Sequence, residues 1–320
     1  MVSNLVEQVM NLFALFRNKF FLLALAVTIA AVIGGEFLES HYGPSPLIGF
    51  IRMFGIPLII IAVASTVFRE RLAANRAALA RQYEKSLQIC GRLISKRPQD
   101  AIAYSIMAYC YFNMNQLEKS IECSDKALTL ASTNALAYAN RAFALIRLNR
   151  PEEALANCEK ALELNKGAIN EKWQRAVILC ARAESLARLK DFPGAMSDSN
   201  EAVVLASGII TGDLHAAALV SRARISLMMG NLNSASADVD GALKRGRRNR
   251  DWILSAAGLV ALKRKDYESA LKYSSQAIAI NKWLAEAYWI RHKVYEEKGE
   301  TAKSESEEKI AKEFDYLPYF

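Results

Sequence analysis

The chain has 320 residues, of which 52% are hydrophobic and 23% are charged, and its formal net charge is +8. It contains only 15 glycines and 7 prolines. This composition excludes collagen-like, linker-dominated and disordered chains. The length allows either two domains of ~150 residues or one elongated array of repeats.

Most of the positive charge lies in one short segment. Residues 1–68 sum to zero, residues 69–100 carry 8 basic and 3 acidic side chains (+5), and the remaining 220 residues carry 30 basic and 27 acidic side chains (+3). The basic segment directly follows the most apolar part of the chain. The positive charge therefore indicates membrane topology more directly than nucleic-acid binding.

The first 18 residues carry apolar side chains at helical spacing, from Val2 to Phe16. This pattern predicts an amphipathic helix over residues 1–18. Such a helix either lies on a membrane surface or forms an oligomerisation surface, and the residues do not distinguish the two.

Two long apolar runs follow, and we expect each to be a transmembrane helix, over residues 19–38 and 47–68. Each run is ~19–22 residues long, the length that a helix needs to cross ~30 Å of hydrocarbon. Residues 39–46 (Glu-Ser-His-Tyr-Gly-Pro-Ser-Pro) form a short loop rich in turn residues. A cleaved signal peptide and a buried soluble hairpin fit these runs less well, because no small-residue cleavage site follows the first run and no large apolar partner follows the second.

The distribution of lysine and arginine predicts the orientation of this hairpin. Arg17 precedes the first run and Lys19 is its first residue, residues 39–46 contain no lysine or arginine, and the basic segment 69–100 follows the second run. The positive-inside rule places both termini in the cytoplasm. We expect an integral protein of a bacterial inner (cytoplasmic) membrane, with residues 19–68 in the bilayer.

From residue 101 the chain repeats with a period of about 34 residues. Counted from Ala101 and from Ala135, Tyr104 corresponds to Tyr138 at position 4 and Ala108 to Ala142 at position 8. Further matches are Asn115 with Asn149, at position 15, and Ala127 with Ala161, at position 27. Small residues are needed where two antiparallel helices approach most closely, and large residues fill the spaces between them.

This pattern resembles the tetratricopeptide repeat. The resemblance implies an all-α fold, a right-handed superhelical solenoid of helix pairs, with six units over residues 101–314 and a tail over residues 315–320. The residues at position 27 are 127, 161, 202, 242, 277 and 311, so two steps are longer than 34. We expect extra residues near 166–173 and 206–215, in connections or in first helices. Residues 69–100 form either a degenerate repeat or a continuation of the second transmembrane helix.

In this family the concave groove is lined by first-helix positions 2, 5, 6, 9, 12 and 13. Repeats 1 and 2 place apolar and aromatic side chains there, which suit an amphipathic helix or an extended apolar peptide. The alternative is that the curvature of the solenoid, or another subunit, already covers them. The predicted groove consists of Ile102, Ile106, Tyr109, Phe112, Leu136, Asn140, Phe143, Ile146 and Arg147. The family's carboxylate clamp for chaperone C-termini is not expected, because only Asn140 matches it.

No motif for catalysis, metal binding or a cofactor is found. The three histidines are far apart, no phosphate-binding glycine loop occurs, and the five cysteines form no CxxC pair. We expect neither a cofactor nor a small-molecule substrate. Candidate anionic contacts are the basic residues Arg69, Arg71, Arg76, Lys244, Arg245, Arg247, Arg248 and Arg250.

The hypothesis that best fits the sequence is a membrane-anchored, non-enzymatic scaffold that binds protein partners in its groove, in the assembly or maintenance of a membrane or envelope complex. One alternative is an extracytoplasmic assembly factor similar to the repeat proteins of cytochrome maturation. Another is a nucleic-acid-binding repeat protein that uses residues 244–250, but its period and groove side chains do not fit that class.

Overall fold

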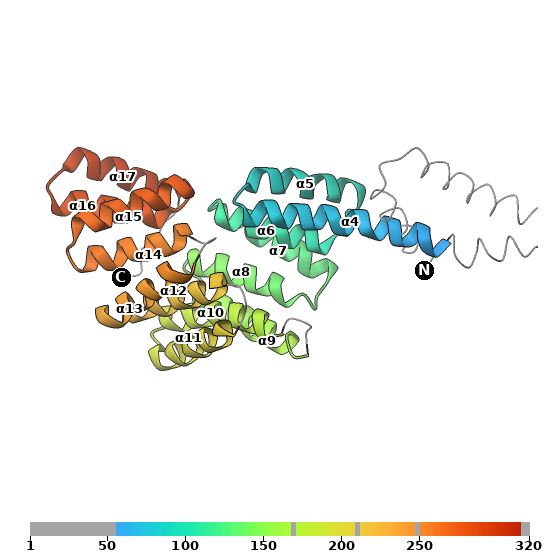
Figure 1. Ribbon diagram of the computed structural model, residues 1–320, viewed down its shortest axis with the longest axis horizontal. Coiled ribbons are helices and arrows are strands. Elements are labelled where there is room, and N and C mark those ends of the chain that lie inside the picture. Colours follow the sequence, from blue (N-terminus) through green and yellow to red (C-terminus); the bar gives the residue numbers. More distant parts are fainter. Residues whose placement is uncertain (1–55, 168–170, 209–211, 247–249, 315–320) are drawn as a thin grey trace, which may run out of the picture. The chain divides into compact units, whose positions relative to one another are not determined.

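The computed structural model describes residues 56–167, 171–208, 212–246 and 250–314 (Figure 1). Within these ranges the chain forms 14 helices, α4 to α17, and no strand. The predicted all-α repeat solenoid is therefore confirmed. The predicted segments 1–18, 19–38 and 39–46, the first part of 47–68 and the tail 315–320 lie outside the described residues.

The chain divides into two compact units. The first comprises Met1–Arg76 and Gln88–Pro98, and the second comprises Ala77–Leu87 and Gln99–Phe320. The described part of the first unit is formed by most of α4 (Ile56–Leu79) and most of α5 (Tyr83–Lys96). Lys96 Nζ lies 3.5 Å from Glu70 Oε1, so the end of α5 returns alongside the middle of α4.

Helix α4 is continuous from Ile56 to Leu79, whereas the sequence places the end of a membrane helix at residue 68. Among the described residues, none of the helices has both the length and the apolar composition that a membrane crossing requires.

The second unit contains six antiparallel helix pairs, and each pair packs on the next along the chain. The pairs are α6 (Ala101–Asn113) with α7 (Leu117–Leu130), α8 (Ala135–Arg147) with α9 (Pro151–Leu164), α10 (Glu171–Arg188) with α11 (Phe192–Ser207), α12 (Gly212–Met228) with α13 (Leu232–Arg245), α14 (Arg250–Lys263) with α15 (Tyr267–Ile280), and α16 (Ala285–Glu297) with α17 (Thr301–Glu313). We number them repeats 1 to 6.

The extra residues of repeats 3 and 4 lengthen their first helices. α10 has 18 residues and α12 has 17, whereas α6 and α8 have 13 each. The longer spacing in the sequence therefore adds a turn at the start of two first helices.

The turn within each helix pair has one geometry, and it also occurs between α4 and α5. The residue at position 15 takes a left-handed backbone, with φ of 56° at Asn115 and 55° at Asn149, and Arg81 takes the same conformation with φ of 61°. The amide of the next residue then donates to a carbonyl five residues back, from Gln116 to Tyr111 and from Gln82 to Ala77, both at 2.9 Å. This hydrogen bond closes the helix end. Residues 77–87 therefore turn as a repeat does, with Arg81 at a position that holds asparagine or glycine in four repeats and lysine in the other two.

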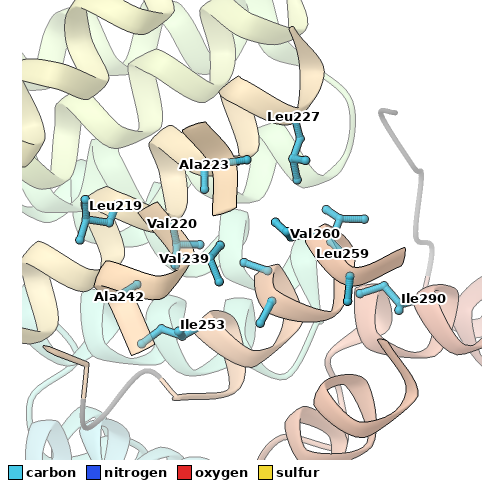
Figure 2. Packing of buried hydrophobic residues seen from close by; sticks show 14 of the residues in the cluster. Leu219, Val220, Ala223, Leu227, Val239, Ala242, Ile253, Leu259, Val260 and Ile290 are labelled. Carbon is cyan, nitrogen blue, oxygen red and sulfur yellow. The ribbon is translucent and has the colours of Figure 1, made fainter. Parts of the chain in front are cut away.

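The small residues predicted at the close approaches are buried. The position-27 alanines, from Ala127 to Ala311, are all at most 3% exposed. Larger side chains fill the space between the helix layers. Figure 2 shows this for repeats 4 to 6, where Leu219, Val220 and Val239 lie on one side and Ile253, Leu259 and Val260 on the other. The core is therefore continuous from one repeat to the next, as expected of a solenoid.

Candidate protein-binding site

The structure places the predicted groove residues on adjacent first helices, and α8 packs against both α6 and α10. Ile102, at the start of α6, is 48% exposed, whereas Ile146 is 1% exposed. The others are partly buried: Ile106, Tyr109, Phe112, Leu136, Asn140, Phe143 and Arg147. Among the predicted groove residues, Ile102 at the amino-terminal end of α6 is thus the one that is exposed.

The carboxyl-terminal part of the groove contacts an aromatic side chain from repeat 5. Trp252, at the start of α14, stacks on Phe112, with ring centroids 5.8 Å apart and an interplanar angle of 23°. Phe112 also contacts Phe143, at 6.0 Å. The Arg147 guanidinium lies 5.8 Å from the Phe112 ring centroid and 5.7 Å from that of Trp252. Side chains from repeats 1, 2 and 5 therefore meet on the inner face.

A buried ion pair lies beside this stack. Arg224 of α12 and Glu286 of α16 are 4% and 2% exposed, and Arg224 Nη2 lies 2.5 Å from Glu286 Oε2. Ser255 Oγ of α14 donates to the same oxygen at 2.6 Å. The Arg224 guanidinium also lies 5.2 Å from the Trp252 ring centroid. The pair thus joins the first helices of repeats 4, 5 and 6.

A second buried carboxylate joins the two ends of the second unit. Asp251, next to Trp252, forms a salt bridge with Arg81 in the turn between α4 and α5. Asn281 Nδ2 donates to Asp251 Oδ2 at 3.0 Å and lies 3.4 Å from the carbonyl oxygen of Asn113. Nearby, Tyr83 contacts Trp283 with ring centroids 5.9 Å apart. Arg81, Tyr83 and Asn113 are therefore linked to repeat 5 and to the connection between repeats 5 and 6.

Burial governs the ionisation of this region. It raises the pKa of Asp251, against the opposing effects of Arg81 and the Asn281 hydrogen bond. It also raises the pKa of the Tyr83 and Tyr109 hydroxyls, with Arg81 again opposing. Water is thus largely excluded here, so polar contacts act in a medium of low dielectric constant.

The sequence prediction missed four residues that lie at groove positions. Trp252 and Glu286 occupy position 2 of repeats 5 and 6, Ser255 occupies position 5, and Arg224 occupies position 9, the position of Tyr109 and Phe143 in the first two repeats. The predicted groove covers repeats 1 and 2 alone. The same positional rule extended to all six repeats identifies these four side chains, although not the contact of Trp252 with repeats 1 and 2.

The predicted basic contacts lie in two places. In the first unit, Arg69 and Arg76 of α4 are exposed and Arg71 is partly buried; Arg92 and Lys96 of α5 are exposed nearby. The end of α13 and the start of α14 in the second unit carry Lys244, Arg245 and Arg250, also exposed. Arg247 and Arg248 lie outside the described residues. In the part of the chain that the structure describes, no group of His, Cys, Asp and Glu could hold a metal ion.

Comparison with known proteins identifies the repeats. The tetratricopeptide-repeat family profiles match residues 101–134 and 135–167, so repeats 1 and 2 are tetratricopeptide repeats. No curated protein matches the sequence significantly.

Solved structures share this fold at low sequence identity. A tetratricopeptide repeat protein from Parabacteroides merdae is 13% identical, covers 87% of this chain and 99% of its own, and has a TM-score of 0.52. A chain of the anaphase-promoting-complex hetero-tetramer Cut9-Hcn1 is 15% identical, covers 87% of this chain and 55% of its own, and has a TM-score of 0.56. At these identities the likeness establishes the fold alone.

Proposed function

We propose that this protein is a non-enzymatic scaffold whose repeat array binds a protein partner through the groove of repeats 1 to 3. The observation that carries the proposal is the apolar surface at the starts of three adjacent first helices. Ile102 on α6 is 48% exposed and Trp173 on α10 is 39% exposed. Leu136 on α8, the helix between them, is partly buried. Exposed apolar side chains on adjacent helices of a solenoid are typical of a protein-binding surface.

A photo-crosslinking amino acid at Ile102 or at Leu136 tests this proposal in intact cells. The matched control places it at Glu118, an exposed position on second helix α7. We expect one and the same protein to be captured from both groove positions and not from the control. We also expect Leu136→Arg to abolish its capture from Ile102. Capture of different proteins at the two positions, or equal capture at Glu118, would count against a specific groove partner.

We further propose that residues 19–38 and 47–68 anchor the array in a bacterial inner membrane, with both termini and the repeats on the cytoplasmic side. The two predominantly apolar runs and the lysine/arginine distribution support this part. Basic side chains of α4 and α5, on either side of the Glu70–Lys96 contact, would then face anionic lipid headgroups, each contributing ~1 kcal/mol near the surface.

Two measurements test the anchor. Resistance of the full chain to alkaline carbonate extraction is expected, and release into the supernatant would refute the two spans. An alkaline phosphatase fusion at the carboxyl terminus should be inactive. Phosphatase activity there would place the repeats outside the cytoplasm, as in the alternative extracytoplasmic assembly factor.

A further inference from the structure

The inner face of the second unit contains a slot for one aromatic side chain. Its walls are the Phe112 ring and the guanidinium groups of Arg147 and Arg224, from α6, α8 and α12. Trp252 of α14 fills it, with its ring centroid 5.8 Å from that of Phe112, 5.7 Å from Arg147 and 5.2 Å from Arg224. Guanidinium groups and the face of a phenyl ring both attract aromatic rings. The slot therefore suits any aromatic side chain and not Trp252 alone.

Asp251, the residue before Trp252, also has a complementary partner, the guanidinium group of Arg81. The carboxylate of Asp251 is 0% exposed, pairs with Arg81 and accepts from Asn281 at 3.0 Å. The acidic–aromatic pair Asp251–Trp252 therefore meets a cation for its carboxylate and a slot for its ring. This is the recognition that a peptide ligand with the same two side chains would receive.

Trp252 fills the slot from a distant part of the chain, while the repeats are held together by other contacts. One hydrophobic cluster joins repeats 4 to 6, a second joins repeats 1 to 3, and a third joins repeats 2 to 4. Trp252 belongs to none of these clusters. Because solenoids are stabilised mainly between neighbouring repeats, the ring can leave the slot without loss of the stacked core.

We propose that Trp252 is an internal competitor for the protein-binding groove. The partner enters by placing an aromatic side chain, preceded by an acidic residue, where Asp251 and Trp252 now bind. This inference rests on the proposed groove function and adds two features to it, the chemistry of the partner segment and the occupant that it must displace. The partner segment then extends towards the starts of α6 and α8, near Ile102 and Leu136.

The direct test uses the dipeptide N-acetyl-Asp-Trp-amide as a probe, with the full-length protein and isothermal titration calorimetry. Trp252→Ala empties the slot, and Trp252→Leu keeps apolar volume without a ring, so that a folded variant is obtained even if the alanine protein is unstable. Tyr267→Ala, which removes an aromatic side chain from second helix α15, outside both the slot and the groove, is the matched control. We expect each Trp252 variant to bind the probe about two- to tenfold more tightly than the wild type and the control, because a stacked ring contributes about that much affinity.

The same probe with alanine in place of tryptophan should bind all four proteins equally weakly. The inference is overturned if the Trp252 variants bind N-acetyl-Asp-Trp-amide no better than the wild type, or if they bind the alanine probe equally well.

Crosslinking in cells separates this inference from the proposed function. With the crosslinker at Leu136, we expect Trp252→Leu to raise the yield of captured partner severalfold over the wild type and over Tyr267→Ala. An unchanged yield of the same partner overturns the proposal that Trp252 competes with it and leaves the proposed groove function intact. Absence of capture in every background refutes the groove function, while the calorimetric test still decides on the slot.

Discussion

The buried pair of Arg224 and Glu286 gives the sharpest energetic test of the structure. Their side chains are 5% and 3% exposed, and 2.5 Å separates Arg224 Nη2 from Glu286 Oε2. Removal of one partner leaves a buried charge without compensation, which costs about 3–5 kcal/mol in proteins. Glu286→Ala also leaves Ser255 Oγ without its acceptor at 2.6 Å. We therefore expect Glu286→Ala to lower the free energy of unfolding by about 3–5 kcal/mol.

Replacement of both partners should restore most of that loss. An apolar pair of similar volume, Arg224→Met with Glu286→Leu, removes two desolvation penalties together with one attraction, and such exchanges are often neutral or stabilising. We expect the loss in free energy of unfolding of the double variant to be at least about 2 kcal/mol smaller than the sum of the losses of the two single variants. Each single variant should also weaken the packing of Trp252, because Arg224 lies over its ring.

Urea unfolding followed by far-ultraviolet circular dichroism measures these differences, and hydrogen exchange locates them in α12, α14 and α16. Because arrays of repeats can unfold in more than one step, the transition that includes these helices is the one compared. Glu153→Ala, which breaks an exposed pair with Arg150 (52% and 48% exposed), is the control and should produce no measurable change. A loss below about 1 kcal/mol for Glu286→Ala would show that the pair is solvated, and would refute the reasoning.

Three further predictions follow from local geometry. A Cβ at Gly246 would lie 2.1 Å from Ile253 Cδ1 and 3.0 Å from Ala216 Cβ, whereas one at Gly258 meets its neighbours at 3.5 Å. Gly246→Ala should therefore lower the free energy of unfolding in urea by about 1–3 kcal/mol, whereas Gly258→Ala should not lower it. Equal effects of the two substitutions would contradict this packing. Asp198→Ala breaks a bidentate ion pair with Arg182 (2.6 and 2.7 Å) that is partly exposed. It should therefore lower the free energy of unfolding by about 1–2 kcal/mol in the same assay. A loss as large as that of Glu286→Ala would contradict this partial exposure. Burial raises the pKa of the Cys110 thiol from 9.0 to about 11, so at pH 8 the thiolate fraction is about 100-fold lower than that of an ordinary cysteine. Mass spectrometry should therefore show slow labelling of Cys110 by iodoacetamide until urea unfolds the chain. Rapid labelling of the native protein would be inconsistent with this burial.

The repeats were predictable because their rules are local. Small residues at positions 8, 20 and 27 and a turn residue at position 15 recur along the chain, and each satisfies a contact within one helix pair or with the next. The structure confirms these rules at Ala108, Ala142 and Ala161, which are 0% exposed, and at the left-handed turns of Asn115 and Asn149. A pattern with a fixed period records such contacts directly.

Arg81 shows where the same rules stop. Its place in the turn between α4 and α5 matches position 15, but it is not the asparagine or glycine that marks this turn in four of the six repeats, so the sequence left open whether residues 69–100 resemble a repeat. The structure shows the turn geometry with φ of 61° at Arg81 and also its salt bridge to Asp251. The side chain is accounted for by a partner 170 residues away, which no local pattern records.

The sequence alone determined the all-α repeat class, the approximate boundaries of the helix pairs, the small residues at their contacts and the segregation of charge at residues 69–100. Each of these depends on side chains within about one repeat of each other. The tertiary structure decided what fills the groove: Trp252 meets Phe112 and Arg147, with Arg224 over its ring, because the second unit brings repeat 5 against repeats 1 and 2. That contact depends on a small rotation at each repeat, accumulated over the array, and such a sum cannot be obtained from any one repeat's sequence.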